Sequence, residues 1–573
     1  MRKCLNKVVF DKEKIVKYLL ISFIVITTFL FVFKIYICED ISISDEAHMY
    51  ATSYRLLQGD ALLVDDWSPE QLYGVVLLPF ITIFRLVVGS NEGLFLFMRY
   101  VYLAMKLVVL FYGLKKIKNI ELCDKSCLYL GLFMWYFFSS WNIEALTYQQ
   151  FPLIMAMFIV ISLLTNNTSK LEWVMVGMAY ALCILSQPFI LLSYVFVLGW
   201  IIYKIFNDRK VSKESVFVHI GIMLVFVIFV ILLFSRARLE DIVRSIPFIF
   251  QEQDHNVAGT GIMGLFNQKI IHVCNVFISE NLVTTYINVF FIIVLHVAFI
   301  CDWKFKNNLV WFIPLILLLS IFSMIPLNKM FLMNEMFIPF IWASLESLFF
   351  VRNKLYLKLL FLSYIFVISI ALGTNTGKIT TSGALCLVAV IFVFFCGDYK
   401  IISVNKESSK KIDILKRLLF LTPIVIIVGI VLFLRVYITW WGVPLSNDSY
   451  ANKITVGPMK GLYANDDEYS HYMNIYNDIN SMDIDSDDIL FCGTASPMAY
   501  LDAEAAFGTM GTPFFSLDYD RLKAYWDSHP DKIPTAIYYE KYTSVDSESF
   551  VNDMLNDYIV TTNGQRLMAL KRY

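Results

Sequence analysis

Long apolar runs separated by short polar segments dominate the chain up to about residue 440. Many of these runs approach the roughly twenty residues that an α-helix needs to cross a bilayer. The first run, 18–37, is too long for the apolar core of a signal peptide. The residues before Cys38 also lack the small side chains of a cleavage site. The pattern therefore predicts an uncleaved first span and a mainly α-helical, polytopic membrane protein.

The distribution of positive charge predicts which loops are cytoplasmic. Lysine and arginine gather before residue 18, after 114, and in 204–213, 304–306, 352–358 and 400–417. For the lysines after Leu114 to be cytoplasmic, the apolar stretch 71–89 must lie along the outer surface without spanning. We therefore expect a cytoplasmic N-terminus and one large outer loop with juxtamembrane helices over 38–92.

The remaining apolar runs complete a count of about thirteen spans, which leaves the C-terminus outside. After the first span, these are expected near 93–114, 127–142, 148–165, 171–187, 189–206, 215–235, 282–301, 309–327, 331–350, 355–372, 384–397 and 418–437.

Residues 440–573 have a different composition, which is dense in Asp, Tyr and Gly. Helices are predicted over 466–482 and 517–526, and strands over 488–492 and 535–539. Asn563-Gly564 between two apolar runs is typical of a β-hairpin. We therefore expect residues 1–439 to form the transmembrane domain and residues 440–573 a small extracytoplasmic α/β domain.

Composition excludes some classes of protein. With 58% hydrophobic residues and a mean hydropathy of +0.63 the chain cannot form a single soluble core. The net charge of −1 gives no indication of a nucleic-acid partner. The ten cysteines show no paired spacing that predicts a disulfide framework or a zinc site. The chemistry is therefore expected in the outer loops.

An acidic pair, Asp45-Glu46, follows the first span within ten residues of Cys38. Ser44 is a plausible helix N-cap, and Asp45, His48 and Arg55 then fall on one face of an amphipathic helix. Acids at a helix start are stabilised by the dipole by about 0.3–1 kcal/mol, so the pair needs no catalytic role. From spacing alone, a catalytic and a purely structural interpretation both stay open.

The continuation of this loop resembles the GT-C glycosyltransferases, especially the protein O-mannosyltransferase and aminoarabinose transferase branch. The resemblance consists of the acidic pair, a Leu-Leu-Gln-Gly helix end over 56–59, the acidic and aromatic Asp65-Asp66-Trp67, and Arg99 at the outer end of the next span. It is clear over about 15–210. A double proline common in the family is replaced by the sequence at 68–71, and Ser186-Gln187-Pro188 stands where relatives often have a lysine.

The resemblance implies that a sugar moves from a polyprenyl-phosphate donor to an acceptor hydroxyl on the outer face of the membrane. Asp45 would be the catalytic base or would orient the acceptor, since partial desolvation raises the pKa of a carboxylate toward neutrality. Glu46 would support it. Arg99 and, less favoured, Arg55 would bind the donor phosphate, because a guanidinium contacts phosphate oxygens in a bidentate way.

Five further residues are candidates for substrate binding: His48, Asp65, Asp66, Glu144 and His255. Each also has a structural interpretation as a solvated side chain, a turn acid or a helix-start acid. His255 lies with Glu252 and Asp254 in an outer loop where relatives place a substrate-covering segment. A divalent cation there is conceivable, but we expect a metal-independent enzyme without a cofactor.

Other functions remain open. A polymerase or ligase of lipid-linked glycans would need a large late outer loop rich in arginine, which the sequence lacks. A carrier or flippase would need acids inside the membrane and pseudo-symmetric halves, whereas the acids of this chain cluster in the outer loops. Glu335 and Glu346 are the exceptions. An inactive scaffold protein is a third alternative. The expected partners are the donor, membrane lipids and an acceptor that is a lipid, a protein or a cell-envelope polymer.

Overall fold

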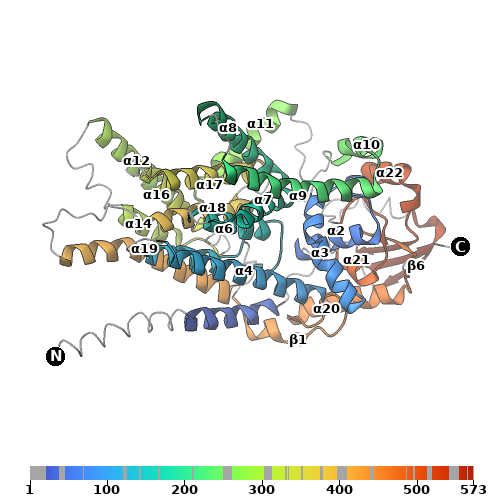
Figure 1. The fold of residues 1–573 in the computed structure, drawn as a ribbon. Helices are drawn as coiled ribbons and strands as arrows, with labels where there is room; N and C mark the ends of the chain where they lie inside the picture. The colour runs from blue at the N-terminus through green and yellow to red at the C-terminus, as the bar shows by residue number, and fades with distance from the viewer. Residues whose placement is uncertain are drawn as a thin grey trace.

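The computed structural model describes residues 21–37, 45–68, 70–120, 125–140, 143–165, 168–208, 212–249, 261–301, 313–329, 332, 335–349, 353–373, 378–396, 410–438, 444–485, 487–493, 497–512, 519–540, 554–563 and 566–571. The described chain is elongated, with a helical bundle at one end and a small α/β domain at the other (Figure 1). We call the side of the bundle that carries this C-terminal domain the outer side.

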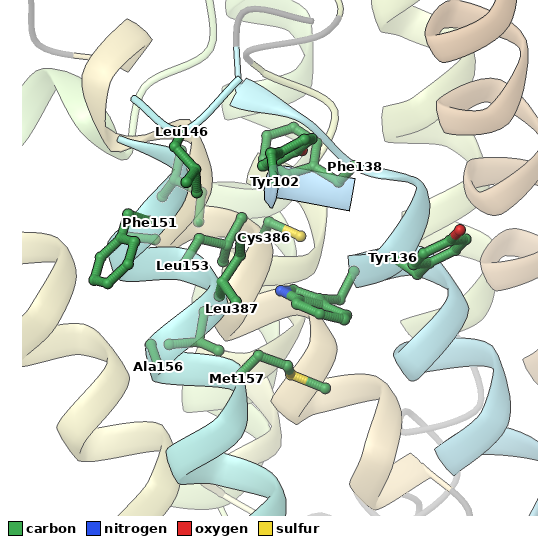
Figure 2. Close-up of a cluster of buried hydrophobic side chains, with 14 of the residues drawn as sticks. Tyr102, Tyr136, Phe138, Leu146, Phe151, Leu153, Ala156, Met157, Cys386 and Leu387 are labelled. Carbon is green, nitrogen blue, oxygen red and sulfur yellow. The ribbon is translucent and has the colours of Figure 1, made fainter. Parts of the chain in front are cut away.

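The bundle consists of apolar helices from most of the chain. After the helix Ile21–Ile35 come α4 (Leu94–Lys118), α5 (Ser126–Phe137), α6 (Gln150–Leu163), α7 (Lys170–Ser186), η2 (Pro188–Ile190), α8 (Leu191–Asp208), α9 (Lys213–Arg236), α11 (Gly261–Val276), α12 (Leu282–Ile300), α14 (Ile313–Met324), α16 (Ile338–Ser347), α17 (Lys354–Gly373), α18 (Lys378–Cys396) and α19 (Lys410–Tyr437). Figure 2 shows part of their core, where Leu153 and Met157 of α6 lie near Leu387 of α18.

Among the described helices, α3 (Gln71–Val88), α4, α9 and α17 are long and apolar enough to cross a membrane. Geometry distinguishes α3 from the other three. Just before α3, the Trp67 N–H donates to Met510 O at 2.7 Å, and near its end Arg85 pairs with Glu504 at 2.9 Å. Both Met510 and Glu504 belong to the C-terminal domain. The two ends of α3 therefore lie on the same side of the bundle, and the helix runs along the outer surface.

A second apolar cluster holds the outer layer together. The end of α2 (Asp45–Gln58), the following turn, α3, the end of α9 and the start of α10 (Leu239–Ile249) meet through Leu56, Leu62, Leu72, Leu233 and Ile242. Figure 1 shows α10 next to α22 (Tyr519–Ser528) of the C-terminal domain. The sequence interpretation treated 235–282 as a loop, and this was wrong for the two segments that form α10 and α11.

The C-terminal domain contains a five-stranded sheet in the order β4-β3-β5-β7-β6. Its strands are β3 (Ile489–Cys492), β4 (Ala506–Phe507), β5 (Ala536–Glu540), β6 (Tyr558–Asn563) and β7 (Arg566–Lys571). β3 is parallel to β4 and β5, while β7 is antiparallel to β5 and β6. The pairing of Asn563 with Arg566 confirms the predicted hairpin.

Helices and short elements complete this domain. They are η5 (Asn447–Tyr450), the two-stranded ladder of β1 (Asn452–Lys453) and β2 (Tyr463–Ala464), α20 (Asp466–Ser481), α21 (Met498–Ala503), α22 (Tyr519–Ser528), η6 (Pro530–Lys532) and η7 (Leu555–Asp557). Asn465 caps α20 by accepting from the Glu468 N–H at 2.8 Å. The observed α20, β3, α22 and β5 agree with the predicted helices and strands to within two or three residues.

Candidate active site beneath the outer loop

Helix α2 places the second acid of the predicted pair inside the protein. Asp45 begins the helix, but its side chain lies outside the described part of the structure. Glu46 is 3% exposed and pairs with Arg99 of α4 through two N–H groups, Nε at 2.9 Å and Nη2 at 2.6 Å. The hydroxyl of Tyr50 also donates to Glu46 at 3.1 Å. Glu46 thus ties α2 to the outer end of α4.

Arg99 has further partners on the first helix. Its Nη1 donates to the carbonyl oxygens of Ile35 at 2.8 Å and Ile37 at 2.6 Å. The guanidinium therefore satisfies a helix C-terminus as well as a carboxylate, and most of its donors are engaged. A role in binding the donor phosphate stays a prediction, and in this structure such a role would require Arg99 to leave partners that it already has.

A polar stripe continues along α4 below Arg99. Tyr102 and Lys106 follow it at i+3 and i+7, which is one face of a helix. The Tyr102 hydroxyl lies 3.1 Å from Ser139 Oγ. Lys106 is 1% exposed, and its Nζ donates to Tyr136 O at 3.0 Å and Phe138 O at 2.5 Å. Lys106 therefore caps the C-terminal end of α5 inside the bundle.

The described chain between α5 and α6, residues 138–140 and 143–149, is irregular and largely buried. At about 1.5 Å per residue the twelve residues of α5 extend only about 18 Å, well short of a membrane span. Gln150 at the start of α6 donates to Ser139 Oγ and Ser140 O, both at 2.7 Å. The Tyr73 hydroxyl of α3 donates to Leu146 O at 2.9 Å. Irregular backbone at this depth is tolerated where protein surrounds it or where it lines a cavity.

This irregular segment carries Glu144, which pairs with Arg435 near the outer end of α19. Glu144 is 4% and Arg435 1% exposed. The guanidinium carbon of Arg435 also lies 4.5 Å from the ring centre of Phe31 and 5.9 Å from that of Tyr102. Residues far apart in the sequence thus meet at one buried point.

Charge and hydrogen bonding are incomplete at this point. Nε and Nη1 of Arg435 and Oε1 of Glu144 have no hydrogen-bond partner among the described residues. Lys106 and Arg435 both lie within interaction range of Glu144. Buried charges are normally paired and hydrogen-bonded. An anion at this point would supply acceptors for the free guanidinium N–H groups of Arg435.

Arg55 lies at the interface with the C-terminal domain. It is fully buried, and it donates to Asp60 Oδ2 at 2.6 Å, Asp65 O at 2.6 Å and Thr509 O at 2.9 Å. Burial lowers the pKa of Arg55, but the carboxylates of Asp66 and Asp60 outweigh it and hold the pKa above its usual value. The geometry makes Arg55 a link between the outer loop and the C-terminal domain, and its predicted contact with phosphate stays untested.

The acids after α2 take part in the same interface. Asp65 Oδ1 lies 3.6 Å from His529 Nε2, and Asp60 Oδ1 accepts from Lys532 at 2.5 Å. Burial raises the pKa of Asp65, with a further increase from Asp60, and burial also raises the pKa of Asp66. Both predicted sugar-binding acids therefore lie under the C-terminal domain.

Aromatic and hydroxyl side chains extend this interface. Trp67 stacks on Phe248 of α10 at 4.4 Å and meets Tyr525 edge-on at 5.2 Å. His48 Nδ1 is hydrogen-bonded to Thr512 Oγ1. A role of His48 in binding substrate stays a prediction. The first outer loop thus forms the platform on which the C-terminal domain sits.

The predicted loop residue His255, with Glu252 and Asp254, lies outside the described residues. Within the part of the chain that the structure describes, no three His, Cys, Asp or Glu side chains are grouped to hold a metal ion. Metal independence therefore stays a prediction.

Sequence reasoning missed Lys106 and Arg435. Lys106 had a local signal, because it follows Arg99 at helical spacing within an apolar run. Arg435 lies in the last two turns of a predicted span, where an arginine reaching toward headgroups is expected. Its partner Glu144 lies 291 residues earlier in the chain. Such a pairing cannot be deduced from spacing.

The fold and the buried charges define an integral membrane protein with a C-terminal domain docked on one end of a helical bundle. No protein-family model and no curated protein matches the sequence. The chain is similar to the crystal structure of ArnT from Cupriavidus metallidurans in the apo state, over 97% of this chain and 98% of that one, with 11% identity and a TM-score of 0.49. A similarity this distant carries no conclusion about activity.

Proposed function

We propose that the chain is a membrane glycosyltransferase that moves a sugar from a polyprenyl-phosphate donor to an acceptor on the outer side. The observation that carries the proposal is the buried group of Arg435, Lys106 and Glu144, with unpartnered guanidinium N–H groups on the outer half of the bundle. Intramembrane charges of this kind are expensive and normally serve a function. A lipid phosphate brings a negative charge and several acceptors to this depth.

In this proposal Asp45, at the start of α2, takes the proton of the acceptor hydroxyl as it attacks the anomeric carbon. The bond from that carbon to the phosphate oxygen breaks, and polyprenyl phosphate leaves with the electron pair. Arg435 and Lys106 stabilise the charge that develops on the leaving phosphate. Glu46 and Arg99 hold the N-terminal end of α2 against α4, and so position the base.

The test is transfer of a labelled sugar from polyprenyl-phosphate sugars to lipid, peptide and glycan acceptors by the purified full chain. Asp45→Asn is expected to lower kcat by at least a hundredfold. Arg435→Lys is expected to raise KM for the donor, because an ammonium lacks the bidentate geometry, whereas Arg99→Lys should mainly reduce stability. Activity should survive EDTA. Full turnover by Asp45→Asn, or an unchanged donor KM in Arg435→Lys, would contradict this assignment.

Glu346 of α16 favours a second candidate, a carrier of lipid-linked glycans. It is 0% exposed, and neither carboxylate oxygen has a hydrogen-bond partner among the described residues. Glu335 gives less support, since it accepts from Ser279 Oγ at 2.9 Å and from the Glu280 N–H at 2.8 Å. A carrier would move a fluorescent lipid-linked glycan across vesicles without forming a glycoside, and Glu346→Gln would stop it.

A further inference from the structure

A groove between α8 and α9 lies away from the candidate active site. It has a volume of about 560 Å³ and is lined by Ile201 of α8 and by Ser215, Val216, His219, Met223 and Val227 of α9. Apart from Ser215 and His219, its lining is apolar. The His219 ring nitrogen Nδ1 already lies 2.7 Å from Ser215 O, which satisfies one polar atom of the wall.

Helix packing explains why the groove exists. Gly177 of α7 and Gly221 of α9 bring these helices so close that an added Cβ would lie 1.9 Å from Val218 O or 2.0 Å from Val174 O. Helix α8 packs on α17, and it meets α9 where the rings of Tyr194 and His219 lie 6.0 Å apart. The side of α9 that faces α8 is therefore only partly covered, and Val216, Ile220, Met223 and Leu224 are 44–53% exposed.

The position of the groove along α9 assigns it to one half of the membrane. The outer end of α9 is fixed by Arg236, whose Nη1 donates to Leu56 O of α2 at 2.5 Å. Ser215 to Val227 lie at the opposite end. These residues extend over about 18 Å along the helix, which is close to half of the roughly 30 Å hydrocarbon core. The groove thus has the length of one leaflet.

Basic residues surround its polar end. Lys213 begins α9 and is exposed. Lys170, which begins α7, has its Nζ 5.7 Å from the ring centre of Phe217 on α9. These two lysines attract an anionic headgroup at the membrane surface.

We propose that the groove holds one acyl chain of an anionic phospholipid from the leaflet opposite the C-terminal domain, with its phosphate near Lys170 and Lys213. The apolar wall matches the chain, the length matches one leaflet, and the cations match the headgroup. The site is independent of the proposed sugar transfer.

Native mass spectrometry of the full chain, titrated with phosphatidylglycerol or phosphatidylcholine, tests the proposal. Wild type should retain one phosphatidylglycerol, and Met223→Trp should fill the groove and weaken its retention by tenfold or more. Ile231→Trp, on the same helix beyond the groove, is the matched control and should retain the lipid. Lys170→Gln with Lys213→Gln should reduce the preference for the anionic lipid by roughly tenfold.

Three results would overturn the proposal. The first is that Met223→Trp retains phosphatidylglycerol as well as wild type does. The second is that wild type retains phosphatidylglycerol and phosphatidylcholine equally. The third is that polyprenyl phosphate copurifies as the bound lipid. Size-exclusion profiles establish that each variant is folded. Because the lysine variants leave the apolar core unchanged, they test the headgroup contact even if Met223→Trp fails to fold.

Discussion

Arg435 and Glu144 form an ion pair whose energetics depend on burial. Removing one partner of a buried pair typically costs about 3–5 kcal/mol, because the other charge is left uncompensated. We therefore expect Glu144→Gln to lower the thermal unfolding midpoint of the purified protein markedly. The double variant with Arg435→Gln should lose less than the sum of the two single losses.

A matched control is available at the pair of Lys116 and Glu172, which is 2.9 Å apart but 11% and 24% exposed. Partly exposed pairs contribute about 0–1 kcal/mol, so Glu172→Gln should shift the midpoint little. Equal shifts for Glu144→Gln and Glu172→Gln would show that burial does not govern the energetics of the Glu144–Arg435 pair.

Asp65 gives the outer interface a pH dependence with a definite sign. Burial and the nearby Asp60 raise the pKa of Asp65 in the folded protein. The folded state therefore binds the proton of the Asp65 carboxyl more tightly than the unfolded state does. The stability that the protonated carboxyl confers is lost as pH rises from about 3.9, the pKa of Asp in an unfolded chain, through the raised pKa of Asp65 in the folded protein. Asp65→Asn should be increasingly stabilising relative to wild type as pH rises from 4 to 8.

Thermal unfolding midpoints of both proteins across that range measure this difference. A constant difference between them would mean that Asp65 titrates alike in the folded and unfolded chains. Asp485→Asn provides a control at an exposed acid of the C-terminal domain.

At the scale of elements, the crossing of α7 and α9 makes a sharp prediction. A Cβ at Gly177 would lie 1.9 Å from a carbonyl oxygen of α9, so the helices must separate to admit it. Close approach through small residues is a main source of helix association in membranes. Gly177→Ala should therefore lower the unfolding midpoint. Gly199→Ala in α8, where an added Cβ meets nothing within 4 Å, should leave it unchanged or raise it slightly.

The same scale shows what the sequence could and could not predict. Long apolar runs and the Asn-Gly turn predicted most helices and the β6–β7 hairpin, because both signals are local. The end of α5 at Phe137, before the predicted end of its span, depends on Lys106 capping it from another helix. Helices α10 and α11 lack the long apolar run of a span, so a search for spans passes over them.

The candidate site was predictable only in part for the same reason. Glu46 and Arg99 could be selected because each stands in a recognisable local context. Their contact, and that of Glu144 with Arg435, is set by tertiary packing. The sequence predicts Asp65 and Asp66 as turn acids or substrate ligands. The C-terminal domain, more than 440 residues later in the chain, covers them.

For the molecule as a whole, the contacts of α3 constrain topology. Since both ends of α3 contact the C-terminal domain, Gln58 and Glu92 must lie on the outer side, together with Asp467 of α20. The basic end of α4 at Lys115 must lie on the opposite side, because α4 then carries the chain across. Counting α3 as a span on its length and apolar character would instead put Gln58 and Glu92 on opposite sides.

Single cysteines placed in a cysteine-free chain distinguish these topologies. Gln58→Cys, Glu92→Cys and Asp467→Cys are at exposed positions, and so is Lys115→Cys. With a membrane-impermeant maleimide added to intact cells, the first three should react alike, and Lys115→Cys should react only after the membrane is permeabilised. The positive-inside rule adds the direction, since Lys115, Lys116 and Lys118 favour the cytoplasm. Opposite labelling of Gln58→Cys and Glu92→Cys would make α3 a span and would separate the outer loop from the domain that covers it.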